Sequence, residues 1–535
     1  MARISTCHAI EGLEDKRESA LQPTHSNQSE LSQAFRATLV HLFLAAKDPA
    51  YIYFILGGIT LLGFVLRVID LNKWIAYDEA YTFIHFASRG FKHILADYSA
   101  PNNHIFHTIL VRMSYRFFGG EPWALRLPAF TAGVLMIPAM YITARRFFSS
   151  TQALAASGLV AVTQSLINYS VNARGYTLLF LFALLLTNFA GILVTRPGKA
   201  ALTAFTLTAT LGFYTIPIFL YPMAGISLWV VATYLATNEP WPDKNRKLAI
   251  FIGACLLSVL LTLLLYSPVI IFGSGLSSLT SNEIVKPLSW SAFWENLDPR
   301  IIKARNKWMI GVGSAAKDVF FDGFLVSLLL YRKISNQKLP IPIFLVLGAA
   351  ILVLLQRVTP VPRVWLYLEV FYLMFAAAGL VWVVEWIIHR LVDPQRGERI
   401  ISAAVLLIFI GAFANILIAR QQNPVFQDRD LLPESYAADY LAAHLAPQDT
   451  IVATGPVDIQ TGYYLSLYNI PFERFYQRDH PVNIQNALVM VRQNSKYKTP
   501  ESVVDFFKLD QALDLSKSKL VYEYASVQIY SIPAK

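Results

Sequence analysis

Charged residues are scarce in this sequence. Asp, Glu, Lys and Arg make up 15% of its 535 residues, whereas a soluble globular protein carries about 25%. Hydrophobic residues make up 55%, and the mean hydropathy is +0.45. Many apolar stretches approach the roughly 20 residues that are needed to cross a bilayer. The composition excludes an ordinary soluble protein and predicts a chain that is embedded mainly in a membrane.

Cysteine is almost absent. Neither Cys7 nor Cys255 belongs to a Cys-x-x-Cys pair or a Cys/His pattern, which argues against a disulfide framework and a zinc finger. Repeats of solenoid period and low-complexity tracts are also lacking. The net charge of +10 does not predict nucleic-acid binding. Much of the Lys and Arg lies in short loops between apolar segments, where it orients a membrane protein.

Eleven membrane-spanning helices are predicted between residues 49 and 420. With a cytoplasmic N-terminus, the loops on the cytoplasmic side are rich in Lys and Arg, as the positive-inside rule requires. Residues 1–48 are polar and lack an apolar run followed by a cleavage site, so we expect no signal peptide there. Within them, Gln33–Lys47 is either an amphipathic helix on the membrane surface or an ordinary helix leading into the first span. The predicted spans are 51–70, 124–144, 152–168, 177–195, 200–214, 217–236, 248–272, 317–331, 340–356, 364–388 and 400–419.

Residues 421–535 form a different kind of sequence. Helical patterns alternate there with short β-type runs, over a length of about 110 residues that can support its own core. We predict a compact soluble α/β domain on the periplasmic or extracellular side. The expected helices are 435–445, 458–468 and 500–509, and the expected strands are 450–453, 487–491, 519–524 and 527–532.

The first outer loop carries an acidic pair, Asp78 and Glu79, a few residues after the first span. A carboxylate at the membrane boundary can take a proton from an acceptor while the reacting centre is shielded from bulk water. An ordinary solvated acidic pair is the alternative. Further along this loop, Asp97, His104 and His107 can coordinate a divalent metal ion or bind a sugar phosphate, although capping and packing explain the His-x-x-His spacing equally well.

Positive charges recur in the outer loops. Arg174 lies between two apolar spans, where a charge is costly without a partner, and a phosphate or a loop carboxylate would serve as that partner. Two later loops mix basic residues with aromatic residues or prolines, a pattern that suits an anionic lipid headgroup or simple anchoring at the interface. Glu369 falls inside the tenth span and either pairs with an arginine or faces a wet cavity. The basic candidates for binding a donor phosphate are Arg174, Lys303, Arg305, Arg357 and Arg363.

Four motifs in a fixed order carry a family resemblance. The sequence resembles the bacterial GT-C glycosyltransferases that are related to protein O-mannosyltransferases and to the aminoarabinose transferase of lipid A. The resemblance covers roughly residues 50–200, and the later spans match only in layout. The motifs are Tyr77-Asp-Glu-Ala-Tyr-Thr82, Pro101-Asn-Asn-His104, Ala124-Leu-Arg-Leu-Pro128 and Tyr169-Ser-Val-Asn-Ala-Arg-Gly-Tyr176.

The resemblance implies a fold, a reaction and roles for residues. The expected fold is a polytopic α-helical GT-C module with a C-terminal soluble domain. Asp78 is the implied general base, with Glu79 beside it as a catalytic or structural residue, and Asp97 resembles a second acidic position near a metal or the acceptor. Arg174 is the implied phosphate-binding or site-assembling residue. Asn172 departs from the usual residue of the fourth motif.

The implied substrates are a polyprenyl-phosphate sugar and a lipid, glycan or protein acceptor. Asp78 would deprotonate the acceptor, which would attack the anomeric carbon and expel polyprenyl phosphate with inversion. The expected location is the bacterial plasma membrane. The alternatives are a transporter or flippase of lipid-linked saccharides, although transporters usually carry charge near the bilayer midplane and show two related halves, an oligosaccharide ligase, and a non-catalytic envelope scaffold.

Overall fold

The structure is a computed structural model. It describes residues 48–195, 197–280, 286–308, 312–391, 432–478 and 483–535, together with the single residues 42, 411 and 414. The N-terminal helix expected at 33–47 and the eleventh span expected at 400–419 therefore lie outside the described residues, apart from those single positions.

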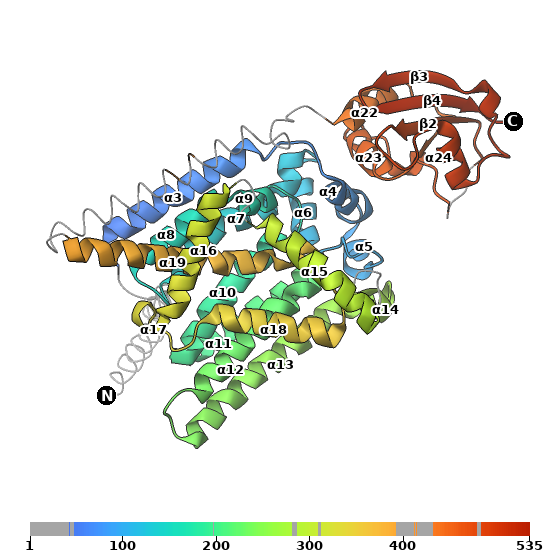
Figure 1. The fold of residues 1–535 in the computed structure, drawn as a ribbon. Coiled ribbons are helices and arrows are strands. Elements are labelled where there is room, and N and C mark those ends of the chain that lie inside the picture. Colours follow the sequence, from blue (N-terminus) through green and yellow to red (C-terminus); the bar gives the residue numbers. More distant parts are fainter. Residues whose placement is uncertain are drawn as a thin grey trace, which may run out of the picture.

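The larger part of the described chain is a bundle of long helices (Figure 1). Each of the first ten predicted spans falls on helical residues, the third of them on two helices. Within the described ranges, six helical segments are long and apolar enough to cross a membrane by length and composition. The polytopic helical class is confirmed, and the count of eleven spans is not. The bundle helices are α3 (Ala50–Ile69), α7 (Pro122–Ala144), α8 (Ser150–Val162), α9 (Gln164–Ser170), α10 (Tyr176–Thr195), α11 (Lys199–Thr215), α12 (Leu220–Leu235), α13 (Trp241–Phe272), α16 (Ser314–Leu329), α18 (Ile341–Gln356) and α19 (Leu366–Leu391).

The third predicted span, 152–168, is interrupted. Helix α8 ends and α9 begins at Thr163, whose backbone is extended with a ψ of 121°. The buried Arg67 of α3 donates hydrogen bonds to the carbonyls of Val160 and Ala161, at 3.2 and 3.0 Å. Carbonyls in the last turn of a helix have no partner within it, so this guanidinium caps α8 from inside the bundle. The break directs α9 toward the end of the bundle that carries the acidic loop.

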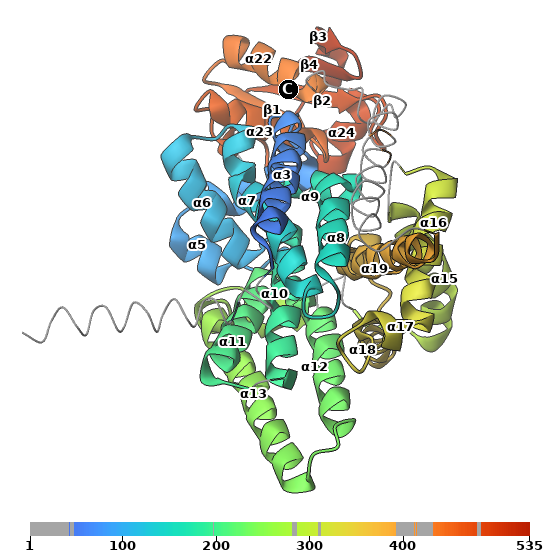
Figure 2. The same ribbon diagram turned by 90° about the vertical axis from the view of Figure 1, so that its left-hand side faces the viewer.

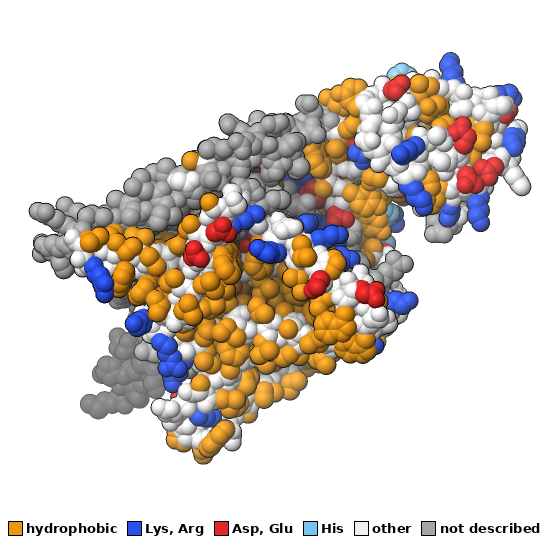
Figure 3. Space-filling view, in the orientation of Figure 1, with side chains coloured by type: hydrophobic (Ala, Val, Ile, Leu, Met, Phe, Trp, Pro, Cys, Tyr) orange, Lys and Arg blue, Asp and Glu red, His pale blue; other side chains and the backbone are white. Residues whose placement is uncertain are grey.

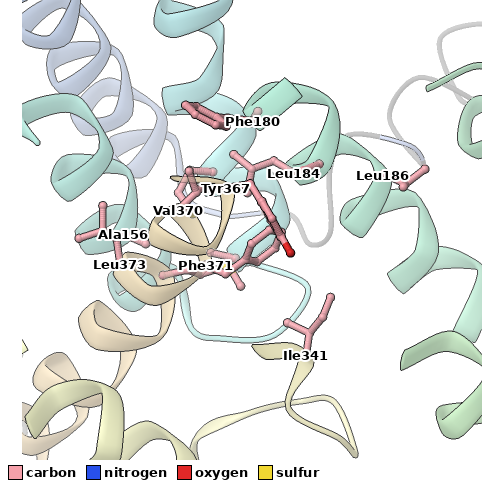
Figure 4. Packing of buried hydrophobic residues seen from close by; sticks show 14 of the residues in the cluster. Ala156, Phe180, Leu184, Leu186, Ile341, Tyr367, Val370, Phe371 and Leu373 are labelled. Carbon is pink, nitrogen blue, oxygen red and sulfur yellow. The ribbon is translucent and has the colours of Figure 1, made fainter. Parts of the chain in front are cut away.

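The core of the bundle includes apolar side chains of α7, α8, α10, α12 and α19. Figure 4 shows Tyr367 and Phe371 of α19 lying beside Phe180 and Leu184 of α10. The side chains of these four residues are buried. Close packing of this kind holds α10 and α19 at a fixed separation. The segments that precede these two helices in the chain are therefore also held in place.

Two long connections between the bundle helices are folded into short helices. Between α3 and α7 lie α4 (Tyr77–Thr82), a π-helical turn (Phe83–Ala87), α5 (Phe91–Ala96) and α6 (Ile105–Phe118). Between α13 and α16 lie α14 (Leu276–Thr280) and α15 (Trp290–Lys307).

The C-terminal part forms the small sheet domain that the sequence predicts. Its strands are ordered β1-β2-β4-β3, with β1 parallel to β2 and the other neighbours antiparallel. The parallel pair is joined through a helix, as a parallel connection requires. The elements are α22 (Pro433–His444), β1 (Asp449–Ala453), α23 (Val457–Leu467), β2 (Asn486–Arg492), α24 (Pro500–Phe507), β3 (Lys519–Tyr524) and β4 (Val527–Pro533).

This domain sits at one end of the bundle, beside α6 and α7 and opposite the α12–α13 hairpin (Figure 2). Phe83 and Ile84 of the π-helical turn share a hydrophobic cluster with Tyr463 of α23, and the Tyr463 hydroxyl donates to the Gly120 carbonyl at 2.7 Å. In the face seen in Figure 3, the bundle surface is mainly hydrophobic. Charged side chains gather on the domain and on the edge that faces it, and Lys and Arg side chains also lie on the opposite edge of the bundle. An apolar surface between two polar ends is typical of a membrane protein.

Candidate active site

Asp78 lies at the polar end of the bundle, in the first turn of α4. The turn begins after Ala76, whose backbone is extended, and an acidic residue is favoured in the first turn of a helix. The Asp78 side chain is 35% exposed. Its Oδ2 lies 2.9 Å from Nη1 of Arg363 and 3.6 Å from Nη1 of Arg174. One carboxylate therefore faces two guanidinium groups that come from distant parts of the chain.

Arg174 belongs to the turn between α9 and α10, and its side chain is only 3% exposed. Its Nη1 donates to the Asp78 carbonyl at 3.2 Å, and its Cζ lies 6.0 Å from the centre of the Tyr176 ring. The Nε–H of Arg174 is buried and has no hydrogen-bond partner among the described residues. The guanidinium is thus held by Asp78 and the Tyr176 ring, and its Nε–H can donate a hydrogen bond to a ligand.

Arg363 lies in the 3₁₀ turn Pro362–Trp365 that leads into α19. Its side chain is 31% exposed, and its Cζ lies 5.8 Å from the centre of the Tyr176 ring. Like that of Arg174, its Nε–H is buried without a partner in the described part of the chain. The packing of α19 against α10 brings Arg363 to Asp78 across 285 positions of sequence.

The three charged groups line a cavity of about 190 Å³. Every residue that lines it carries a polar group, so the cavity suits a polar or charged ligand. The lining residues are Asp78, Asn168, Tyr169, Asn172, Arg174, Tyr176 and Arg363.

His104 does not line the cavity but contacts the turn that carries Arg174. Its Nδ1 accepts a hydrogen bond from the backbone N–H of Gly175 at 2.8 Å, and its Nε2 lies 3.4 Å from Nη2 of Arg174. Burial and the charge of Arg174 hold the pKa of His104 well below its ordinary value, so the ring is neutral. His104 therefore positions the turn that carries Arg174 and adds no charge to the site.

Gly175→Ala is expected to damage the site. A methyl group at this position would lie 2.8 Å from Thr215 Cγ2 and 3.1 Å from His104 Cβ, and contacts this short force neighbouring groups to move. We expect activity to fall by about tenfold or more, because a small displacement of a catalytic group is costly. The control is Gly198→Ala, where a methyl group meets nothing within 4 Å. Equal activity of the two variants would contradict the tight packing around Gly175.

Glu79 does not line the cavity. Its fully buried carboxylate accepts two hydrogen bonds from Arg126, both at 2.8 Å, and one each from the backbone N–H groups of Ala76 and Ala173, at 2.9 and 2.6 Å. All four contacts are structural. They connect α4, α7 and the Arg174 turn, so the geometry favours a positioning role for Glu79 over the catalytic role predicted from the sequence.

Arg126 extends this connection to the end of the first predicted span. Its guanidinium donates to the carbonyls of Leu71, Lys73 and Trp74, at 2.8–3.0 Å. Arg126 belongs to the motif at residues 124–128, but no role was predicted for it from the sequence. A charged residue near the start of an apolar span was the signal, because such a charge persists only with a partner.

The other predicted residues lie elsewhere. Asp97 Oδ2 lies 3.1 Å from His93 Nε2, and its Oδ1 accepts a hydrogen bond from the Ser99 N–H at 2.8 Å. His107 is buried, and burial and the charge of Arg174 lower its pKa to about 3. Glu369 is buried and accepts from the Ser165 hydroxyl at 2.8 and 2.9 Å. The predicted basic residues outside the cavity are Lys303 and Arg305, exposed on α15, and Arg357, whose Cζ lies 5.8 Å from the centre of the Trp290 ring.

The predicted metal ligands do not form a cluster. Within the described ranges, no group of three or more His, Cys, Asp or Glu side chains is arranged to hold a metal ion. The His104 Nδ1 is already occupied by the Gly175 N–H. A divalent metal remains a prediction from the sequence, and no reaction step below depends on one.

Part of the chain is similar to a known protein family. Residues 102–272 match the model of the family described as dolichyl-phosphate-mannose-protein mannosyltransferase. The matched region includes His104, Arg126 and Arg174 and leaves out Asp78 and Arg363. No curated protein matches the sequence.

Solved structures share the fold. ArnT from Cupriavidus metallidurans in the apo state is 12% identical, with a TM-score of 0.60 over 90% of this chain and 97% of that one. The same protein bound to undecaprenyl phosphate gives the same identity and score over 90% and 98%. The apo Archaeoglobus fulgidus oligosaccharyltransferase is 11% identical, with a TM-score of 0.50 over 87% and 73%. The fold expected from the sequence, a helical membrane module with a C-terminal domain, is thereby confirmed.

Proposed function

We propose that this chain, which has the GT-C fold, is a membrane glycosyltransferase that moves a sugar from a polyprenyl-phosphate donor to an acceptor. The observation that carries the proposal is the meeting of Arg174 and Arg363 at Asp78 in one polar cavity. A relative in fold, ArnT, has been solved with undecaprenyl phosphate. That ligand supports the choice of donor class for this chain.

The charges of the cavity suit a phosphodiester. Two guanidinium groups and one carboxylate leave one positive charge, and the linkage of a polyprenyl-phosphate sugar carries one negative charge. The two buried Nε–H donors that lack partners in the described residues offer further hydrogen bonds to phosphate oxygens. Guanidinium groups bind phosphate through several such bonds, which strengthen in a site shielded from water.

The reaction follows from this arrangement. When the phosphate engages Arg174 and Arg363, the Asp78 carboxylate is released to accept the proton of an acceptor hydroxyl or amine. The acceptor atom forms a bond to the anomeric carbon, and the bond from that carbon to the phosphate oxygen breaks with its electron pair on the oxygen. The arginines stabilise the charge on the departing polyprenyl phosphate. A single displacement inverts the anomeric carbon, and the phosphate leaves without an acid.

The proposed location is the outer face of a bacterial plasma membrane. Helix α4, which carries Asp78, lies at the same end of the bundle as the C-terminal domain (Figure 1), whereas the first turns of α13, which carry Lys244, Arg246 and Lys247, lie at the other end (Figure 2). Loops rich in Lys and Arg stay in the cytoplasm. This orientation lets a lipid carrier enter from the bilayer while the acceptor arrives from the aqueous side.

The experiment that tests the proposal is sugar transfer by the purified full chain. Radiolabelled polyprenyl-phosphate sugars would be presented in lipid nanodiscs, each with lipid, glycan and peptide acceptors. We expect one donor to be consumed with label appearing on an acceptor. Intact donor in every reaction, together with passage of lipid-linked saccharide across vesicles, would instead support a transporter.

Replacing either cavity arginine by lysine should weaken donor binding. Lysine keeps the charge but loses the forked donors, so we expect the donor KM of Arg174→Lys and Arg363→Lys to rise about 10- to 100-fold. The control is Lys303→Gln on α15, outside the cavity. A change in the control as large as in the arginine variants would contradict the assignment of the phosphate site.

A further inference from the structure

The C-terminal domain places one carboxylate beside the segment that carries Asp78. Asp458 is the second residue of α23, which packs against α4 (Figure 1). The contact is fixed at Ile75, whose N–H donates to the Tyr464 hydroxyl at 3.3 Å and whose carbonyl accepts from the Gln460 amide at 3.0 Å. Asp458 is therefore held at the junction of the domain and the catalytic loop.

Asp458 has no cationic partner in the part of the chain that the structure describes. Its Oδ1 accepts a hydrogen bond from the N–H of Ile459 at 2.6 Å. No Lys, Arg or His of the described ranges forms an ion pair with it. A partly buried carboxylate without a counter-charge is unfavourable for folding. Such a group is a candidate for function when it lies near a reaction centre.

The Tyr77 side chain lies close to Asp458. A methyl group at Gly455 would lie 3.8 Å from both the Tyr77 hydroxyl and the Asp458 Oδ1, so the two groups flank this glycine. Tyr77 immediately precedes Asp78 and is 36% exposed. Burial and the negative charges of Asp458 and Asp78 help to raise the pKa of Tyr77 to about 12. Its hydroxyl is a hydrogen-bond donor at neutral pH.

A row of rings extends from Tyr77. Its ring centre lies 6.2 Å from that of Tyr81, which lies 4.3 Å from His85, and His85 lies 5.5 Å from Phe472 of the C-terminal domain. Aromatic faces beside a carboxylate match a sugar ring, whose C–H groups pack on the aromatic face while its hydroxyls donate to the carboxylate. A serine or threonine side chain offers one hydroxyl and no such face.

We propose that Asp458 and Tyr77 form a carbohydrate-binding subsite that positions the sugar of a glycan or glycolipid acceptor for Asp78. This inference rests on the proposed function and names the acceptor class. Both residues act as positioning residues: Asp458 accepts hydrogen bonds from acceptor hydroxyls, and Tyr77 supplies an aromatic face and a donor hydroxyl. The C-terminal domain then contributes directly to the choice of acceptor.

The first test compares acceptor and donor kinetics in the full chain. With methyl hexopyranosides as acceptors, Asp458→Asn should raise the acceptor KM about tenfold or more. The donor KM should stay within about twofold, and Asp458→Glu should recover part of the loss. The matched control is Asp505→Asn, an exposed carboxylate of α24 in the same domain. An unchanged acceptor KM, an equal rise in the donor KM, or transfer to serine and threonine peptides alone would overturn the proposal.

Direct binding separates this proposal from the proposed function. Saturation-transfer NMR of methyl hexopyranosides with the full chain in nanodiscs requires no donor. We expect sugar signals with the wild type and with Asp505→Asn, and their loss in Asp458→Asn. Binding that depends on Asp458, with no transfer from any donor, would overturn the proposed reaction and keep the subsite. Transfer without any dependence on Asp458 would overturn the subsite and keep the reaction.

Thermal unfolding distinguishes a binding residue from a structural one. Burial raises the pKa of Asp458 to about 6 from its ordinary 3.8, so its ionisation disfavours the folded state as the pH rises from 4 toward 6 and above. The groups that face it, Tyr77 and Tyr81, have raised pKa values and do not titrate there. Asp458→Asn should therefore raise the Tm at pH 7.5, and the difference should shrink below pH 5. A lower Tm at pH 7.5 would show that the carboxylate is structural and overturn the proposal.

Discussion

Asp78→Asn is expected to lower kcat by about 10²- to 10⁴-fold, which is the range for loss of a positioned general base. The substituted amide has nearly the same shape but cannot take the acceptor proton. It also removes the negative charge that faces Arg174 and Arg363. Binding of polyprenyl phosphate should therefore be unchanged or tighter, because the phosphate no longer competes with a carboxylate. The measurement is single-turnover sugar transfer together with equilibrium binding of undecaprenyl phosphate.

The matched control for this prediction is Asp298→Asn, an exposed carboxylate on α15 that does not line the cavity. Its kinetics and lipid binding should match the wild type. If Asp78→Asn retained transfer within a few-fold of wild type while Asp298→Asn behaved as expected, Asp78 would not be the base. If Asp78→Asn lost lipid binding along with transfer, the carboxylate would have a binding role instead.

Arg126→Leu is expected to be the most destabilising substitution near the site. It would leave the Glu79 carboxylate buried with only two backbone N–H partners and would free three carbonyls of the loop after α3. Removing one member of a buried ion pair typically costs about 3–5 kcal/mol. We expect a Tm lower by many degrees and loss of folded protein in detergent. Activity should disappear together with the fold.

The double variant Glu79→Gln/Arg126→Gln provides the comparison. It leaves no unpaired charge in the interior, so its loss of stability should be smaller than that of Arg126→Leu. Glu79→Gln alone should also destabilise the protein, because it leaves the Arg126 charge buried. Equal thermal stability of Arg126→Leu and the wild type would contradict the role of this pair as the connection between α4, α7 and the Arg174 turn.

The sequence predicts the positions of the helices and strands better than it predicts the contacts between them. Apolar runs locate the helices at the first ten predicted spans, because burial in a membrane requires long apolar segments. In the C-terminal domain, alternating patterns locate all four strands of the sheet to within a residue or two. The break at Thr163 was not predicted, because it is held by Arg67 from another helix rather than by a Pro or Gly. Local patterns contain no information about such a contact.

The same holds for the candidate site: its residues can be predicted one by one, but their meeting in space cannot. Asp78, Arg174 and Arg363 were identified individually, because charges beside apolar spans are costly and therefore informative. Their convergence depends on the packing of α10 against α19, which no local pattern reveals. Lys303 and Arg305 have the same charge and similar neighbours in sequence but lie on an exposed helix. Asp458 is about 380 positions from Asp78, and only the seating of the C-terminal domain brings it near.

The central claim is that the protein breaks the bond between a sugar and a lipid phosphate. The most direct test follows a polyprenyl-phosphate sugar by ³¹P NMR during incubation with the purified full chain and a sugar acceptor. We expect the phosphodiester signal to convert to that of free polyprenyl phosphate at the rate at which sugar appears on the acceptor. No conversion is expected with Asp78→Asn. A phosphodiester signal that persists for every donor tested, while the lipid-linked sugar crosses the bilayer intact, would contradict it.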